Sequence, residues 1–178
     1  MINTISYNTP YKAIPMSRVD IRNIAEKLKE KLQIPINQPY IDVTQVLERL
    51  CDEDSKFSFE IVEDDVLEEG VQAESDVQHH TIYIKKSVYD GAAMNNGRDR
   101  ITIAHEIFHI LLHQQNTLVL FRRDAETRKI YENPEWQAEC FAGEFLMPYN
   151  FIKDLSIQEI MENCKVTESA AYYQTSHI

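Results

Sequence analysis

The stretch 101–113 constrains this chain more than any other, because it contains the pattern H-E-x-x-H at His105, Glu106 and His109. On an α-helix, side chains four residues apart lie on one face, so the two imidazoles can bind a single zinc ion. Glu106 projects about 100° further round the helix, where its carboxylate can reach a water on the metal without binding the metal. Two neutral imidazoles, a general base and an open coordination position are the parts of a zinc hydrolase.

The residues around this pattern indicate a buried helix with one polar face. A narrow polar strip holds His105, Glu106, His109 and His113. The wide arc opposite the strip is apolar and consists of Ile103, Ala104, Ile107, Phe108, Ile110, Leu111 and Leu112. This layout fits a core helix whose polar strip faces a cleft. The alternative is a buried helix whose histidines are only hydrogen-bonded, but a glutamate directly after the first histidine favours the metal site.

A catalytic zinc ion needs a third protein ligand. His113 follows His105 by eight residues, which places it about 12 Å further along the helix axis. That distance is too long for both imidazoles to share one ion. We therefore expect the third ligand to be a carboxylate from a second helix, which Asn133 and Pro134 are predicted to begin as N-cap and first helical residue.

The second helix offers three glutamates, Glu135, Glu139 and Glu144. Glu135 and Glu139 lie one turn apart on the same face. In such a pair the first carboxylate typically binds the metal and the second orients a ligand histidine through a hydrogen bond. We predict these roles for Glu135 and Glu139, with the reverse assignment as the alternative. Either can also be an acid that only stabilises the start of the helix. Glu144 is expected at the surface or at the rim of a cleft.

Composition limits the class of protein. The chain has 178 residues, enough for one domain. Its net charge of −11 argues against direct nucleic-acid binding, which needs a basic surface. Cys51, Cys140 and Cys164 are few and far apart, so we expect free thiols in the reducing cytoplasm. No apolar run reaches the ~18 residues of a membrane span, and we recognise no signal peptide at the N-terminus.

Periodicity and capping signals predict an α+β fold. It should be mostly helical, with a small antiparallel or mixed sheet of about three strands packed beside the H-E-x-x-H helix. We expect an extended lead-in over 1–16, a zinc metallopeptidase domain over 17–150, and short C-terminal helices over 151–178 packed on the same domain. Residues 87–97 are predicted to form a loop.

The alternating residues 81–86 are predicted to form a strand just before the motif helix. An edge strand beside such a helix can bind an extended peptide by adding it to the sheet. We offer 81–86 as that strand, and an ordinary sheet strand is the equally good alternative.

The two helices together carry the marks of a known family. The pattern R-x-x-x-x-H-E-x-x-H runs from Arg100 to His109. The chain then matches E-x-x-A-x-x-F-A-x-x-L-L-M-P from Glu135 to Pro148, apart from one position. In these motifs the chain resembles the ImmA/IrrE family of metallo-endopeptidases, and the likeness extends more loosely over 17–175. The departures are Phe108 for a frequent Gly, Glu139 for a common Asn, and Phe145 for a Leu; none of them is a ligand.

The resemblance implies a gluzincin-like site, with His105, His109 and Glu135 as Zn²⁺ ligands and Glu106 as general base. It also implies a cytoplasmic endopeptidase that cleaves or inactivates a helix-turn-helix transcriptional repressor of a phage, mobile element or stress regulon. The alternative is a non-proteolytic partner of such a regulator, as in a toxin–antitoxin-like pair, with an idle or structural metal site.

One further group is needed for hydrolysis, a donor that stabilises the oxyanion beside the metal. Tyr131, Tyr149 and His113 are the candidates that the sequence offers for this role.

Overall fold

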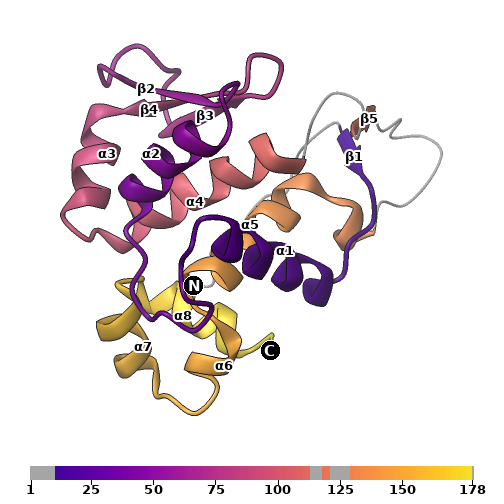
Figure 1. The fold of residues 1–178 in the computed structure, drawn as a ribbon, viewed down its shortest axis with the longest axis vertical. Coiled ribbons are helices and arrows are strands. Elements are labelled where there is room, and N and C mark those ends of the chain that lie inside the picture. Colours follow the sequence, from indigo (N-terminus) through magenta and orange to yellow (C-terminus); the bar gives the residue numbers. More distant parts are fainter. Residues whose placement is uncertain (1–10, 113–117, 121–128, 178) are drawn as a thin grey trace.

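The computed structural model describes residues 11–112, 118–120 and 129–177. Helices dominate, and a small sheet covers one side of the motif helix (Figure 1). In chain order the elements are β1 (Tyr11–Ala13), α1 (Arg18–Lys31), α2 (Val43–Glu53), β2 (Ser58–Val62), β3 (Ala73–Asp76), β4 (Thr81–Lys85), α3 (Lys86–Ala93), α4 (Gly97–Leu112), β5 (Leu118–Leu120), η1 (Ile130–Glu132), α5 (Pro134–Leu146), α6 (Tyr149–Ile152), α7 (Ile157–Cys164) and α8 (Glu168–Thr175).

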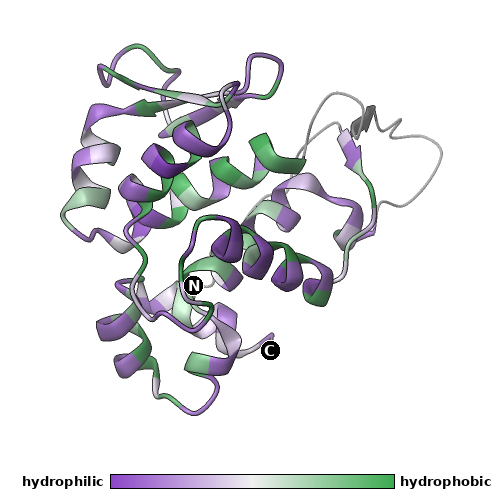
Figure 2. Ribbon diagram, viewed as in Figure 1, coloured by the Kyte–Doolittle hydropathy of each residue, from purple (hydrophilic) through white to green (hydrophobic). Residues whose placement is uncertain are grey.

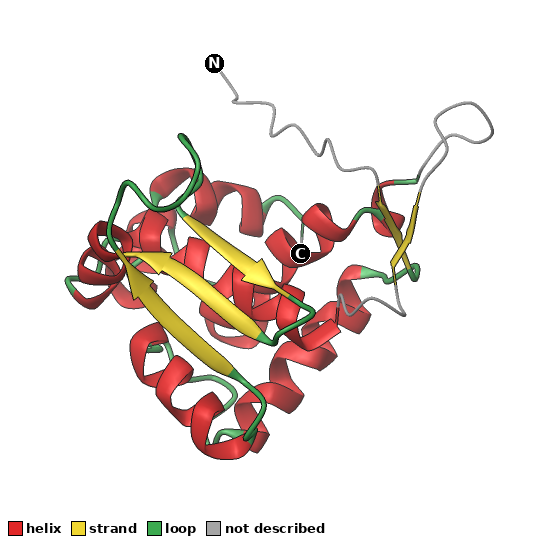
Figure 3. Ribbon diagram, turned by 90° about the horizontal axis from the view of Figure 1, so that it is seen from above, coloured by secondary structure: helices red, strands yellow, loops and turns green. Residues whose placement is uncertain are grey.

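The main sheet has the strand order β2-β4-β3 (Figure 3). β4 runs parallel to β2 and antiparallel to β3, so the sheet is mixed. Short strands β1 and β5 form a separate antiparallel pair. The predicted α+β fold, mostly helical with a small sheet beside the motif helix, is confirmed.

The proposal of 81–86 as a substrate-binding edge strand is wrong. Thr81–Lys85 is the central strand, with hydrogen-bonded neighbours on both sides, and Lys86 already begins α3. The edge strand that packs on α4 is β3. An alternating sequence predicts a strand but not its neighbours, because pairing depends on segments far away in the chain.

The prediction of a loop over 87–97 is also wrong, because Lys86–Ala93 forms α3. Gly91 suggested a chain break, but it lies inside this helix. A Cβ atom at position 91 would meet the carboxylate of Asp99, so α3 packs closely on α4 at this glycine.

Side-chain caps begin several of the helices. The hydroxyl of Ser17 accepts a hydrogen bond from the backbone N–H of Asp20, whose carboxylate accepts one from the N–H of Ser17. Ser156 and Glu159 form the same capping box before α7. Asp42 caps α2. Each cap satisfies N–H groups that have no partner within their own helix.

α4 lies at the centre of the core. It contacts α5, α3, β3 and β4, and its side chains Ile103, Ala104, Ile107 and Phe108 are fully buried. The ring of Phe108 packs 4.9 Å from that of Phe141 on α5. Figure 2 shows the contrast with α1, which is mostly hydrophilic in colour. The wide apolar arc predicted for the motif helix is therefore what holds it in place.

The start of α4 is fixed to the turn between α7 and α8. A Cβ atom on Gly97 would lie 2.7 Å from backbone atoms of Val166 and Thr167, so only glycine allows this approach. The guanidinium of buried Arg100 donates hydrogen bonds to the carbonyls of Cys164 and Lys165. These carbonyls lie at the end of α7, where the helix itself offers them no hydrogen-bond donor. Arg100 provides the donors.

A buried ionic cluster connects α1 to α5. The side chain of Glu144 has no exposed surface, and it accepts hydrogen bonds from Arg18 and Arg22. Arg18 also donates to Gln174 of α8. Glu144 was expected at the surface or at a cleft rim, and that expectation is wrong. A buried carboxylate requires such partners, because removing an unpaired charge from water is costly.

No helix among the described residues combines the length and apolarity that crossing a bilayer requires.

Lys29 of α1 is buried, with 1% of its surface exposed. Its Nζ lies 3.3 Å from the carbonyl oxygen of Ile36 and 5.5 Å from the centre of the Phe145 ring. Burial lowers the pKa of Lys29 to about 8 from an ordinary value of 10.5, although nearby acidic groups oppose the shift. The folded protein therefore binds fewer protons than the unfolded chain between these two values. The contribution of Lys29 to the free energy of unfolding is therefore lowest below pH 8 and rises as the pH increases above 8.

We predict that Lys29→Met raises the free energy of unfolding at pH 7. The advantage over wild type should shrink by about 1 kcal/mol between pH 7.5 and 9, as Lys29 loses its proton in the folded wild type. Urea unfolding of both proteins at each pH measures the difference, in which contributions of the other groups largely cancel. A pH-independent difference would contradict a lowered pKa for Lys29.

Candidate metal centre

His105 and His109 project from the same face of α4, one turn apart. Their Nε2 atoms lie 2.9 Å from each other, and their ring centres are 4.7 Å apart. The apolar residues on the other side of α4 are packed in the core. Because the apolar side of α4 packs in the core, the two imidazoles lie on the side of the helix that is open to a ligand.

Glu135 meets the two histidines because α5 begins immediately before it. The side chain of Asn133 accepts hydrogen bonds from the N–H groups of Glu135 and Trp136, and Pro134 occupies the first position of the helix. This start places Oε2 of Glu135 3.1 Å from Nε2 of His105 and 3.5 Å from Nε2 of His109. The structure therefore brings together the three residues that the sequence proposed as ligands.

The three donor atoms fit a tetrahedral zinc site. Zinc bonds to nitrogen and carboxylate oxygen are about 2.0–2.1 Å long, so corners of the tetrahedron lie about 3.3–3.4 Å apart. The observed separations of 2.9, 3.1 and 3.5 Å bracket that value. Such a close group of nitrogen and oxygen lone pairs is unfavourable unless a proton or a cation lies between them. Within the described part of the chain, His105, His109 and Glu135 form a group that can hold a metal ion.

Charges around the site shift the pKa values of two of the three donor residues in opposite directions. Burial lowers the pKa of His105, but the hydrogen bond with Glu135 and the negative charges of Glu106, Glu135 and Glu139 raise it by more, so the net shift is upward. Burial raises the pKa of Glu135, and its hydrogen bonds with His105 and His109 lower it by more, well below the usual value. A cation at the site would take the place of a proton between the donors.

One side of the group stays accessible. The side chains of His105, His109 and Glu135 are 21%, 13% and 40% exposed. Structural zinc sites have four protein ligands, whereas catalytic sites have three and keep one position open for water or substrate. Among residues 11–112, 118–120 and 129–177, three donors converge and one side is exposed, which is the arrangement of a catalytic site.

Glu106 follows the first histidine on α4 and is not one of the three converging donors. Its Oε2 accepts a hydrogen bond of 2.6 Å from the hydroxyl of Ser75 on β3. Its negative charge contributes to the raised pKa of His105. The carboxylate is thus near the group without belonging to it, as a general base requires.

Glu139 lies one turn after Glu135 on α5 and is partly buried. Its negative charge also contributes to the pKa of His105. The role of orienting a histidine therefore remains a prediction for Glu139.

The three candidates for stabilising the oxyanion differ in position. His113 lies outside the described residues. Tyr149 lies beyond the far end of α5 under Arg22, and that end, at Leu146, is on the order of 16 Å from Glu135 at ~1.5 Å per helical residue. Tyr131 is in η1, one turn before Glu135, and is 37% exposed. Of the described candidates, Tyr131 is therefore the one at the same end of α5 as Glu135.

Two residues with clear roles around the motif helix were missed from sequence. No local pattern in the sequence indicates that Ser75 meets Glu106. Arg100 was noted as part of a family motif, and its partners are carbonyls sixty-four and sixty-five residues away. Contacts at such separations depend on tertiary packing, so a single sequence does not reveal them.

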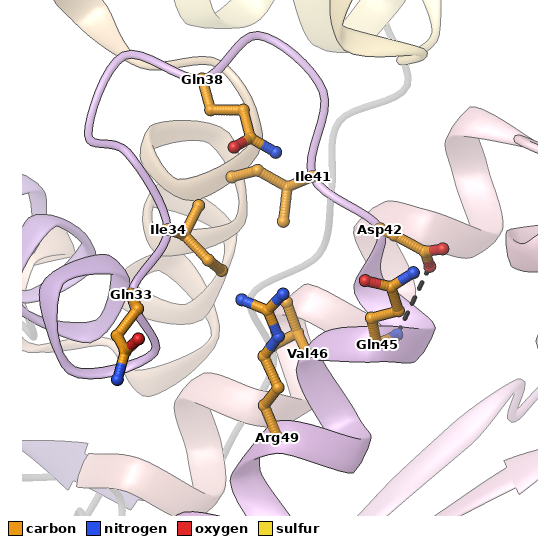
Figure 4. Close-up of a pocket in the computed structure, with 8 residues that line it drawn as sticks. All are labelled: Gln33, Ile34, Gln38, Ile41, Asp42, Gln45, Val46 and Arg49. Atoms are coloured by element: carbon orange, nitrogen blue, oxygen red, sulfur yellow. Dashed lines mark hydrogen bonds between the residues drawn. The ribbon is translucent and has the colours of Figure 1, made fainter.

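A small cavity of about 90 Å³ lies elsewhere, between α2 and the segment that follows α1 (Figure 4). It has room for about three water molecules. A peptide is too large to enter it. Several polar side chains around it already have partners: Arg49 donates to the carbonyl of Leu32, and Gln38 to that of Tyr40. The metal group on α4 and α5 does not line this cavity, which therefore plays no part in the proposed chemistry.

We predict that Glu135→Ala weakens zinc binding by more than the roughly 10- to 100-fold loss typical of removing an outer hydrogen-bond partner. Glu139→Gln should fall within that smaller range if Glu139 orients a histidine. Glu162→Ala, which changes an exposed glutamate of α7, serves as the control. Competition with a chromogenic chelator measures the three affinities. Wild-type affinity in Glu135→Ala would remove Glu135 from the ligand set.

Comparison with known proteins agrees with this geometry. A search of curated proteins finds no match to the chain. The model of the peptidase family M78, described as the IrrE N-terminal-like domain, matches residues 56–176. The match covers more than half of the chain and includes both the H-E-x-x-H helix and α5. The chain therefore belongs to the IrrE N-terminal-like family of M78 peptidases.

Proposed function

We propose that this protein is a zinc-dependent endopeptidase with Glu106 as its general base. The observation that carries the proposal is the convergence of His105, His109 and Glu135, whose donor atoms lie within 4.8 Å of one another. Membership of a peptidase family supports the reaction class. Two imidazole nitrogens and one carboxylate oxygen are a donor set that zinc prefers, and one side remains open.

Hydrolysis needs a Lewis acid, a general base and a donor to the oxyanion, and different groups of the site would provide them. Bound zinc would supply a Lewis acid that lowers the pKa of a water to about 7 and polarises the scissile carbonyl. Glu106 accepts a proton as the water oxygen bonds to the carbonyl carbon. It then delivers that proton to the amide nitrogen as the C–N bond breaks, leaving a carboxylic acid and an amine. Tyr131 is the nearest described candidate to donate a hydrogen bond to the oxyanion.

β3 takes the place of 81–86 as the strand that would hold the substrate. It is an edge strand, it packs on α4, and Ser75 reaches Glu106 from it. An extended peptide paired with its open edge would lie alongside the motif helix. A peptide held in this way is bound mainly through its backbone.

For the target, we propose a helix-turn-helix transcriptional repressor, on the strength of the resemblance to the ImmA/IrrE family. Such a target acts in the cytoplasm, where we expect this protein to work. The free thiols of Cys51, Cys140 and Cys164 suit a reducing compartment. The net charge of −11 favours contact with the repressor rather than with its DNA.

We predict that Glu106→Gln binds zinc like the wild type but cleaves peptides at least about 100-fold more slowly, because it removes the general base and no ligand. The assay mixes zinc-loaded protein with peptides of known sequence and detects the fragments by mass spectrometry. A chelator should abolish cleavage, and Glu162→Gln should retain it. Cleavage by Glu106→Gln at the wild-type rate would exclude the proposed mechanism.

A helix-turn-helix repressor from the same genome is the protein substrate to test, beginning with any that is encoded beside this gene. Cutting by wild type but not by Glu106→Gln would support the proposed target. A stable complex in which the zinc-loaded wild type leaves the repressor uncut would instead favour the non-proteolytic alternative.

A peptide that is cleaved also tests β3. We predict that N-methylating a substrate amide that hydrogen-bonds to this edge raises KM by about tenfold, the value of one lost hydrogen bond. Methylating alternate amides distinguishes the two edges of the peptide, since only one edge faces β3. Equal effects at every position would argue against strand pairing.

A further inference from the structure

Ser75 makes two contacts with the same residue of the motif helix. Its hydroxyl lies 2.6 Å from Oε2 of Glu106 and 3.0 Å from the backbone oxygen of Glu106. The hydroxyl has one hydrogen, and the shorter distance is that of a hydrogen bond to a charged carboxylate. Ser75 therefore donates to the carboxylate in the arrangement seen here, with the backbone oxygen as a second acceptor within reach.

The sheet determines that Ser75 points at α4. Ser75 pairs with Ile82 and Ala73 pairs with Ile84, and side chains of directly paired residues lie on the same face of a sheet. Ile82 and Ile84 are fully buried in the core. Ser75 shares this inward face, so its hydroxyl is directed towards α4 while its backbone remains in the edge strand.

This contact limits where the carboxylate of Glu106 can be. A glutamate side chain has several rotatable bonds, and on the open face of a helix it samples many rotamers. A general base must lie within hydrogen-bond reach of the proton that it removes. A short charge-assisted bond from a rigid strand selects one orientation in advance, which is how surrounding residues support a catalytic group.

We propose that Ser75 is a positioning residue that holds the Glu106 carboxylate for proton transfer. The inference rests on the proposed function, since it assigns Ser75 a part in the same reaction. The side chain of Ser75 acts through Glu106 and contacts neither substrate nor metal.

Because two acceptors of Glu106 lie within reach, Ser75 can stay hydrogen-bonded to this residue both before and after Glu106 takes up the proton. While Glu106 is charged, the hydroxyl donates to Oε2. When Glu106 holds the proton on that oxygen, the hydroxyl turns to donate to the backbone oxygen of Glu106 and accepts the hydrogen bond of the carboxylic acid. The proton then leaves for the amine nitrogen and the hydroxyl returns to Oε2. Ser75 keeps its own hydrogen throughout.

A purely structural role must be separated from this one, because Ser75 also joins β3 to α4. Ser58 provides the matched control. Its hydroxyl bonds to that of Thr81, 2.8 Å away, in the same sheet. Ser58→Ala removes a serine hydroxyl from the sheet without touching Glu106. Ser75→Thr is the conservative variant, since threonine keeps the hydroxyl and suits a strand.

The first test uses Co²⁺ in place of zinc, because its visible absorption bands report the coordination of the ion without any substrate. We expect Ser75→Ala to shift these bands as Glu106→Gln does, and Ser75→Thr and Ser58→Ala to leave them at wild-type positions. Adding Ser75→Ala to Glu106→Gln should produce no further shift. Wild-type bands in Ser75→Ala would overturn the positioning role. Absence of Co²⁺ bands in the wild type would instead refute the proposed metal site, and with it this inference.

The second test is kinetic and uses a peptide that the wild type cleaves. Ser75→Ala should lower kcat by about 10- to 100-fold while KM changes little, because the base is misplaced and the substrate contacts remain. Ser75→Thr should recover most of kcat, and Ser58→Ala should match the wild type. Equal losses in Ser75→Ala and Ser58→Ala, both reversed on cooling, would show that the effect is one of sheet stability and would overturn the proposal.

Discussion

The packing of α4 against α5 is the contact on which the candidate site depends. Two imidazoles from one helix and a carboxylate from the other lie within 4.8 Å of one another, an arrangement that is unfavourable without a bound proton or cation. The core compensates for it, because Ile103, Ala104, Ile107 and Phe108 of α4 are fully buried and Phe108 packs on Phe141. Burial of these residues outweighs the local repulsion and keeps the donor atoms together before any metal binds.

Buried polar contacts around the core hold two pairs of helices together, α4 with α7 and α5 with α1. Arg100 ties the start of α4 to the end of α7, and Glu144 ties α5 to α1 through two arginines. Glu144 and Glu135 lie on the same helix but have opposite roles. The first is enclosed by cations of the chain itself, and the second faces a position that can take an external cation. Their surroundings, and not their residue type, make one structural and the other a candidate ligand.

The sheet contributes a second support. β3, not β4, is the edge strand beside α4, and Ser75 of this strand donates a hydrogen bond to Glu106. In the function that we propose, one short strand would both pair with a substrate and hold the general base. This would couple substrate position to base position within a few residues of backbone. The metal ligands come from helices and the proposed substrate contacts from a strand, and α4 touches both.

Features that depend on neighbours along the chain follow from the sequence alone. The spacing of His105 and His109 places them on one helical face, and Asn133 with Pro134 begins α5 beside Glu135, because helical periodicity and capping act within a few residues. Other features follow from tertiary packing. Packing places Thr81–Lys85 in the middle of the sheet and Lys86–Ala93 in a helix instead of the predicted loop. It also buries Glu144 and brings Ser75 to Glu106. Each of these depends on segments far apart in the chain, whose pairing is set by packing of the whole core and not by local sequence.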